Sequence, residues 1–381
     1  MIATHSEKNK DIEVLRAFAV GGVLAHHATG VLLPPLRGEL AWIPETFNFG
    51  AGVDLFFVIS GFVIARSLLP RLRNAGSAAQ SVKETLAFWT RRAFRLLPTA
   101  WLWLALILAV TSSFAFNNPK LAFETNVDAT VAGVFYFANV RFAETFGASP
   151  YGASFHYWTL SLEEQFYFLL PLIALLSGRR LGWALLALIA IDLLRPPSLL
   201  AVSTRASALL IGVLIAMWSE QKSYARLAAM TPRWLALPVS VAALLAIPYL
   251  SAAIGPFYQA QYGLVSLVAG VSVLAASFNK DALCGWGPWR GFALWAGARS
   301  YALYVIHVPL FLVIQDVLRR TWHPPWSPEL CAIVLISAGL LLALIAELNY
   351  RIVESPLRRL GARIADGIAG RSEPGQREAA A

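Results

Sequence analysis

The chain has 381 residues, of which 57% are hydrophobic and 14% charged, and its mean hydropathy is +0.60. Soluble domains are far more polar, so these values exclude an ordinary water-soluble fold and favour an integral membrane protein. The formal net charge of +9 fits basic loops on one side of a membrane and does not imply a nucleic-acid partner.

Apolar stretches long enough to cross a bilayer as helices recur along the chain, separated by short polar breaks. The sequence therefore predicts an all-α fold, a polytopic transmembrane bundle of about ten spanning helices. Their expected limits are residues 13–33, 49–69, 93–113, 156–177, 183–194, 199–218, 234–252, 262–278, 292–318 and 330–353. The stretch 183–194 is short enough for a half-crossing, and the apolar segment 128–142 is expected at the membrane interface.

The distribution of basic residues gives the orientation. With the N-terminus inside, 19 Lys and Arg fall in cytoplasmic segments and 6 fall outside. Because Lys and Arg accumulate in cytoplasmic loops, both termini are predicted to be cytoplasmic. Residues 1–357 are expected to form one transmembrane domain, and residues 358–381 a basic, disordered tail against an anionic leaflet. Cys284 and Cys331 have neither CxxC nor metal-ligand spacing, so we expect no disulfide framework and no metal.

The first span carries two ionisable groups on one face. Arg16 and His27 are eleven residues apart, which places them on the same side of a helix, roughly 16 Å apart along its axis. Such groups are costly in a bilayer unless they face a cavity or a partner. His27 is therefore a candidate base for removing a proton from an alcohol. His26 points to a different face, and a structural role is the better interpretation for it.

The second and third spans add an acid and three arginines. Asp54 could orient a histidine or pair with an arginine, while Gly61 permits close helix packing. Arg91, Arg92 and Arg95 open the third span at helical spacing, and paired guanidinium groups suit phosphate oxygens. An ordinary positive-inside anchor would explain the first two equally well, but Arg95 lies a turn deeper among apolar residues.

Two later runs contain the remaining candidates. Glu163 and Glu164 are adjacent at the entrance of a span. Two carboxyl groups at a membrane entrance usually mark a site or neutralise a buried arginine. His307 lies midway along the ninth span, two residues before Pro309. Because a proline frees a carbonyl and bends its helix, a structural role for this histidine weighs about as much as a functional one.

These runs together resemble the acyltransferase 3 family of integral-membrane acyltransferases, and the similarity spans nearly the whole chain. Any one run is weakly specific, but their order and spacing make the set specific. The matching stretches are Leu15 to Ala17 with His27, Gly52 to Phe62, Arg91 to Pro98, Trp158 to Tyr167, Ser300 to Pro309, and Glu354 to Pro356.

The resemblance implies transfer of an acyl group, most often acetyl, from a cytoplasmic acyl-CoA to a hydroxyl that is often on the outer side. His27 matches the family's essential histidine, Arg16 its arginine partner, and Glu163 its important carboxylate. The sequence departs from the family in two places. Residues 206–208 supply no acid after Arg205, and His26 replaces the usual tyrosine.

From the residues and the resemblance together we predict a site with three parts. The expected catalytic residues are His27, Arg16, Glu163 and Asp54. The expected donor-binding residues are Arg92, Arg95 and Arg91. The expected acceptor-binding residues are Glu164, His307, Tyr301 and Trp158.

The predicted reaction uses acyl-CoA, most simply acetyl-CoA, as the donor and a carbohydrate or lipid-linked sugar as the acceptor. The predicted location is the bacterial cytoplasmic membrane, in contact with lipid. Two alternatives stay open: an acyltransferase acting on a small hydrophobic metabolite such as a macrolide, and a transporter of a glycan or lipid-linked sugar. The chain has no evident internal repeat, which counts against the transporter.

Overall fold

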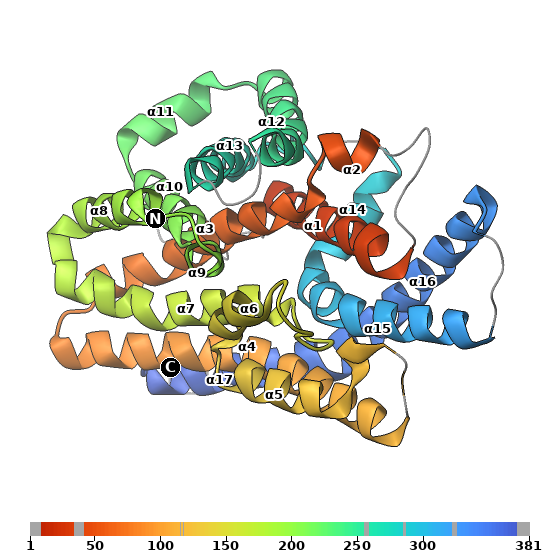
Figure 1. Ribbon diagram of the computed structural model, residues 1–381. Coiled ribbons are helices and arrows are strands. Elements are labelled where there is room, and N and C mark those ends of the chain that lie inside the picture. Colours follow the sequence, from red (N-terminus) through yellow and green to blue (C-terminus); the bar gives the residue numbers. More distant parts are fainter. Residues whose placement is uncertain are drawn as a thin grey trace.

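The computed structural model describes residues 9–33, 42–114, 116, 118–254, 259–284, 287–321 and 326–371. Every regular element in this part of the chain is a helix, so the predicted all-α class is confirmed (Figure 1). Eight helical segments among these residues are long and apolar enough to cross a membrane, and Gln261–Ser277 is a shorter apolar helix. A polytopic membrane bundle is therefore confirmed, while the count of ten spans stays a prediction.

The first half of the bundle contains α1 (Lys10–His27), η1 (Ala28–Leu32), α2 (Trp42–Thr46), η3 (Phe49–Ala51), α3 (Gly52–Arg73), α4 (Ala78–Ser113), η4 (Pro119–Leu121), α5 (Phe123–Val134), α6 (Ala138–Thr145) and α7 (Tyr157–Ser177). The second half contains η5 (Gly178–Arg180), α8 (Leu181–Leu194), α9 (Leu199–Ser203), α10 (Ser207–Trp218), α11 (Lys222–Met230), α12 (Arg233–Ala253), α13 (Gln259–Ser277), α14 (Trp289–Ala298), α15 (Ser300–Thr321), α16 (Pro328–Asn349), η6 (Tyr350–Glu354) and α17 (Ser355–Ile368).

Helices α3 and α10 cross at very short range because glycine faces glycine. A Cβ atom on Gly61 would lie 2.0 Å from the Leu209 carbonyl oxygen, and one on Gly212 would lie 2.2 Å from the Val58 carbonyl oxygen. Any side chain at either position would collide with the opposite backbone. The close approach that the sequence predicts for Gly61 is thus the feature that sets the spacing of these two helices.

Helix α8 turns back from the end of α7 and lies beside α10 (Figure 1). Gly178 makes the turn with φ +50°, a conformation that favours glycine. The 14 residues of α8 are about 21 Å long, which is shorter than the hydrocarbon core. The half-crossing expected for residues 183–194 stays a prediction.

The predicted single span over residues 292–318 is wrong, because the chain is divided there into α14 and α15. The break is at Arg299, whose φ and ψ are −104° and 8°. Its guanidinium group donates to both carboxylate oxygens of Glu347 on α16, at 2.7 and 3.1 Å. This ion pair attaches the junction of α14 and α15 to α16.

The C-terminal segment also differs from the prediction, because residues 355–368 form a helix rather than the start of a disordered tail. Helix α17 lies along α4 (Figure 1). A Cβ atom on Gly361 would lie 2.2 Å from Phe94 Cβ, and Ala365 is buried. Burial of this small-residue face against α4 explains why a strongly basic segment is ordered. Residues 372–381 lie outside the described part of the chain.

Both described ends of the chain lie at one end of the bundle. Asn9 Nδ2 donates to the Ala276 carbonyl oxygen at 2.9 Å, at the C-terminal end of α13. Arg371 pairs with Glu84 near the start of α4. Contacts between Tyr224 and Ser277, and between the ends of α3 and α10, join these regions. We call this the Asn9 end and the opposite one the His27 end; which of them faces the cytoplasm stays a prediction.

Candidate functional site

Five helices, α1, α3, α4, α7 and α15, surround a polar cavity of about 70 Å³ inside the bundle. We call it the arginine cavity. Of the predicted site residues, it brings together Arg16, Arg92, Arg95, Glu163 and Tyr301. Its other polar lining residues are Ser60, Thr159, Tyr167, Ser300 and Tyr304. Residues of all three predicted groups, catalytic, donor-binding and acceptor-binding, thus meet in one place.

The arginine cavity has more positive charge than its own carboxylate can neutralise. Glu163 Oε1 accepts a hydrogen bond from Ser60 Oγ at 2.7 Å, and Arg16 is paired at 2.9 Å with Glu13. The buried Nε atoms of Arg92 and Arg95 have no hydrogen-bond partner among the described residues. Buried guanidinium donors without partners are costly, so this end of the cavity is suited to an anion.

His27 lies outside the arginine cavity, in a cluster of histidines nearer the His27 end. Its Nδ1 is 2.8 Å from Nε2 of His307 on α15, and the ring centroids of His307 and His156 are 5.2 Å apart. Tyr304 connects the cluster to the cavity, since its side chain lines the cavity and its carbonyl oxygen is 2.6 Å from His307 Nδ1. The two parts of the site are therefore adjacent.

The hydrogen bonds fix the tautomers of both histidines. A carbonyl oxygen can only accept, so His307 Nδ1 carries the proton donated to the Tyr304 carbonyl. In the neutral ring, His307 Nε2 is then an acceptor, and His27 Nδ1 must donate to it. The lone pair of neutral His27 is thereby placed on Nε2, which has no hydrogen-bond partner in the part of the chain that the structure describes.

Pro309 explains how His156 joins this cluster. Proline lacks an N–H group, so the carbonyl of the residue four positions earlier, Val305, loses its helical hydrogen bond. His156 Nε2 donates to that carbonyl oxygen at 3.1 Å. The carbonyl that the sequence predicts Pro309 to free is thus satisfied by His156 rather than by His307.

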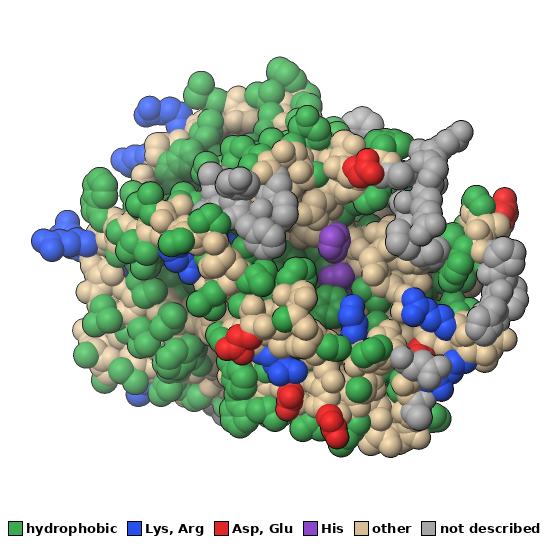
Figure 2. Space-filling view, viewed as in Figure 1, with side chains coloured by type: hydrophobic (Ala, Val, Ile, Leu, Met, Phe, Trp, Pro, Cys, Tyr) green, Lys and Arg blue, Asp and Glu red, His purple; other side chains and the backbone are tan. Residues whose placement is uncertain are grey.

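His27 is reachable from the His27 end of the bundle. It is half-buried and its neighbour His26 is exposed. Figure 2 shows histidine side chains in a hollow of the molecular surface. The ring of His27 packs edge-on against Phe155, with 5.3 Å between the centroids. A ligand arriving from this end can meet the imidazole without crossing the arginine cavity.

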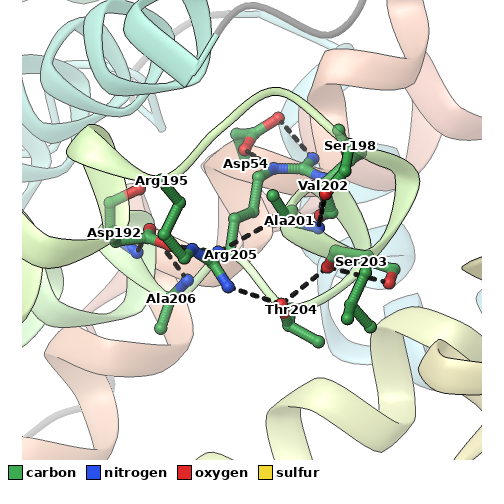
Figure 3. A network of polar contacts seen from close by, with 12 residues as sticks. Asp54, Asp192, Arg195, Ser198, Ala201, Val202, Ser203, Thr204, Arg205 and Ala206 are labelled. Atoms are coloured by element: carbon green, nitrogen blue, oxygen red, sulfur yellow. Dashed lines mark hydrogen bonds and ion pairs between the residues drawn. The ribbon is translucent and has the colours of Figure 1, made fainter.

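Asp54 has a different environment from the one expected of a catalytic residue. Its two carboxylate oxygens accept hydrogen bonds from Nε and Nη2 of Arg205, both at 3.1 Å, and both side chains are buried (Figure 3). Arg205 Nη1 also donates to the Val202 carbonyl at 2.7 Å. The alternative that Asp54 pairs with an arginine is therefore the one the structure supports, and Asp54 does not line the arginine cavity.

The same region contains a second acidic anchor. Asp192 Oδ2 accepts from the backbone N–H groups of Ala206 and Ser207 at 3.1 and 2.9 Å, at the start of α10 (Figure 3). Arg195 donates to the other oxygen of this carboxylate. Asp192 thus caps α10, the helix that α3 crosses through the two glycines.

Three other predicted residues lie away from the cavity. Arg91 faces α17, with 3.6 Å between its Nη1 and Asp366 Oδ1. Trp158 stacks on Phe142 at 5.5 Å between the ring centroids. Glu164 is not among the cavity-lining residues, because adjacent positions on a helix point about 100° apart. Of the three arginines expected to bind the donor, Arg92 and Arg95 thus share the cavity and Arg91 does not.

Sequence reasoning missed three residues near the site. Ser60 lies inside a matching stretch and His156 opens the expected span 156–177, but their partners are far away in sequence, so no spacing signals them. Tyr136 lies between α5 and α6 with φ +56°, and its buried hydroxyl has no hydrogen-bond partner in the described ranges. Burial raises the pKa of Tyr136, and the nearby Glu164 raises it further.

Comparison with known proteins assigns residues 9–348 to a family described as an acyltransferase domain. The chain is 28% identical to the peptidoglycan O-acetyltransferase OatA of Listeria monocytogenes over 92% of its length and 56% of the relative's. It is 26% identical to the O-acetyltransferase OatA of Staphylococcus aureus, with 92% and 57% coverage. It is 27% identical to the putative peptidoglycan O-acetyltransferase YrhL of Bacillus subtilis, with 92% and 55% coverage. The chain thus spans about half the length of these relatives, and no solved structure matches it.

Replacing Asp54 tests whether it is structural. We expect Asp54→Asn to lower the free energy of unfolding by about 3–5 kcal/mol, because it leaves the buried Arg205 guanidinium without its counter-charge. Glu220→Gln, which breaks the exposed pair with Arg73, is the matched control and should cost less than about 1 kcal/mol. Unfolding of both purified variants in detergent measures this. An Asp54→Asn protein that keeps its stability but transfers no acyl group would restore the catalytic prediction.

Proposed function

Because this chain belongs to the acyltransferase 3 family of integral-membrane acyltransferases, we propose that it moves an acetyl group from acetyl-CoA to a hydroxyl of a cell-envelope glycan. The observation that carries the proposal is the placement of two chemically different parts along one bundle. Guanidinium donors without partners lie in the arginine cavity, and an imidazole with an available Nε2 lies beyond it, towards the opposite end. The names of the relatives support acetyl transfer to peptidoglycan.

The donor is assigned to the arginine cavity. Arg92 and Arg95 can bind phosphate oxygens through planar, bidentate hydrogen bonds. The cavity volume of about 70 Å³ suits a narrow acyl-bearing arm, so the nucleotide would stay at the mouth. Arg16 and Glu163 lie along the same cavity, and we place them with the donor. Tyr304 marks the inner end of this path, where the thioester would reach the histidine cluster.

The chemistry is assigned to His27. Its Nε2 takes the proton of the acceptor hydroxyl, and that oxygen forms a bond to the carbonyl carbon of the thioester. The carbon–sulfur bond then breaks, and the departing thiolate takes the proton back from His27. The donated Nδ1 hydrogen bond holds the ring in the tautomer that this step requires.

Removing the base tests the proposed function. Purified protein with radiolabelled acetyl-CoA and a soluble peptidoglycan disaccharide should label the sugar, and His27→Ala should lower this rate by about 10²–10⁴. Phe18→Ala, an exposed position on the same helix, is the control and should transfer normally. Intact thioester in the wild-type reaction would favour the transporter, and normal labelling by His27→Ala would remove His27 from the mechanism.

Arg95 and Arg91 form a matched pair for testing the donor site, since both are on α4 and only the former lines the described cavity wall. We expect Arg95→Gln to raise the KM for acetyl-CoA about tenfold, because a hydrogen bond from a charged group contributes roughly 1.5–3 kcal/mol. Arg91→Gln should leave this KM within about twofold. Equal effects of the two substitutions would mean that general basicity, and not the cavity, attracts the donor.

His307 is expected to act as a positioning residue through His27. His307→Ala removes the acceptor that holds the Nδ1 proton, so kcat should fall at least about tenfold while both KM values stay near those of the wild type. His307→Gln can present a side-chain oxygen close to the lost Nε2 and should recover part of kcat. A purely structural role would instead lower the stability of both variants and would show no such recovery.

A further inference from the structure

A second cavity, of about 740 Å³, opens at the His27 end between α1, α2, α12 and α13. Its volume lies in the range of small-molecule binding pockets and is about ten times that of the arginine cavity. The lining residues that matter here are His26, Glu45, Asn48, Phe49, Gln261 and Tyr262. We call it the His26 cavity. None of the predicted site residues lines it.

Gln261 gives this cavity an acceptor that is not used within the described chain. The side chain is 2% exposed, and its Nε2 donates to the Ser251 carbonyl oxygen. Its Oε1 is buried and has no hydrogen-bond partner in the described residues. Since the amide nitrogen is held by the backbone, Oε1 is fixed in place and available to a ligand that donates an O–H or N–H.

Asn48 is one of the lining residues, and three hydrogen bonds hold it in place. Its Nδ2 donates to Ser251 Oγ at 3.1 Å, and its Oδ1 accepts from Gly50 N at 3.1 Å. Its own backbone N–H donates to the Pro248 carbonyl at 2.9 Å. Side chain and backbone together thus tie the segment after α2 to α12.

The described lining of the His26 cavity is weakly acidic, whereas that of the arginine cavity is basic. Among its described lining residues there is one carboxylate, Glu45, and there is no lysine or arginine. Phe49 and Tyr262 add aromatic surface beside the amide and imidazole groups. A phosphate-bearing ligand would meet no fixed cation on the described part of these walls. Hydroxyl groups would find acceptors there, and an apolar ring face would find an aromatic surface.

The His26 cavity adjoins the proposed base. His26 lines it, and the ring centroids of His26 and His27 are 5.3 Å apart. Consecutive residues of a helix point about 100° apart, so the cavity and the His307 contact lie on different sides of α1. A ligand in the His26 cavity would therefore approach His27 from the side that the donor does not occupy.

We propose that the His26 cavity is the acceptor site and binds one hydroxyl-bearing sugar ring that carries no phosphate, with Gln261 Oε1 accepting a hydrogen bond from a ring hydroxyl or amide N–H. This inference rests on the proposed function and adds where the acceptor binds and why phosphorylated acceptors are disfavoured. The ring enters from the His27 end and presents its reacting hydroxyl to His27 Nε2.

Gly30 allows the cavity to be filled without disturbing the helix packing. It lines the His26 cavity, and a Cβ atom there would meet nothing within 4 Å. Gly21 on α1 has the same open surroundings but does not line the cavity. Gly30→Phe should raise the KM for a soluble peptidoglycan disaccharide at least about tenfold, while the KM for acetyl-CoA is unchanged. Gly21→Phe should change neither value.

Gln261→Met provides a second variant, which keeps the length of the side chain and removes the acceptor oxygen together with the Nε2 donor to the Ser251 carbonyl. Its KM for the same disaccharide should rise about fivefold, the loss typical of one neutral hydrogen bond. If the wild-type protein labels the disaccharide and both variants keep its KM, the acceptor-site assignment is wrong and the proposed function stands. If the wild-type protein transfers no label, the proposed function itself fails. Thermal unfolding of each variant separates loss of binding from loss of fold.

Discussion

A guanidinium group inside an apolar bundle needs a partner, and this requirement organises much of the structure. Arg205 satisfies it with a bond from each of its three nitrogens, to both oxygens of Asp54 and a backbone carbonyl. Arg92 and Arg95 keep buried Nε donors without a partner in the described chain. An isolated buried charge costs several kcal/mol, so the second arrangement is stable only where water or a ligand completes it. An unpartnered Nε alone does not mark a site, since Arg195 has one as well, but Arg92 and Arg95 also line the cavity.

Helical periodicity predicted which residues share a helix face, but not which cavity of the bundle their side chains line. The spacing of Arg92 and Arg95 correctly placed both on the cavity wall. Arg16 and His27 also share a face of α1, yet Arg16 lines the arginine cavity and His27 lies beyond it. Their separation along the axis is roughly 16 Å, which exceeds the reach of a cavity of about 70 Å³. The sequence alone could not predict how far the cavity extends along α1, since this depends on how other helices fill the space between Arg16 and His27.

The partners that the sequence could not supply come from far along the chain. His27 and His307 are 280 positions apart, and Asp54 and Arg205 are 151 apart. For Asp54, pairing with an arginine was one of two open alternatives, and only the crossing of α3 with α10 decides between them. That crossing depends on Gly61 and Gly212, because any side chain at either position would displace the opposite backbone. Local composition thus predicts that a buried acid needs a partner, while helix packing selects which one.

Two backbone carbonyls of α15 orient the histidine cluster. Pro309 lacks an N–H group and therefore releases the Val305 carbonyl, which accepts from His156. One residue earlier, the Tyr304 carbonyl accepts from His307 Nδ1 and thereby fixes the acceptor character of His307 Nε2. The orientation of His27 then follows without a carboxylate, whose burial beside neutral imidazoles would require a further counter-charge. Backbone carbonyls near a helical proline provide the same directional control with no net charge, which suits a site inside a membrane.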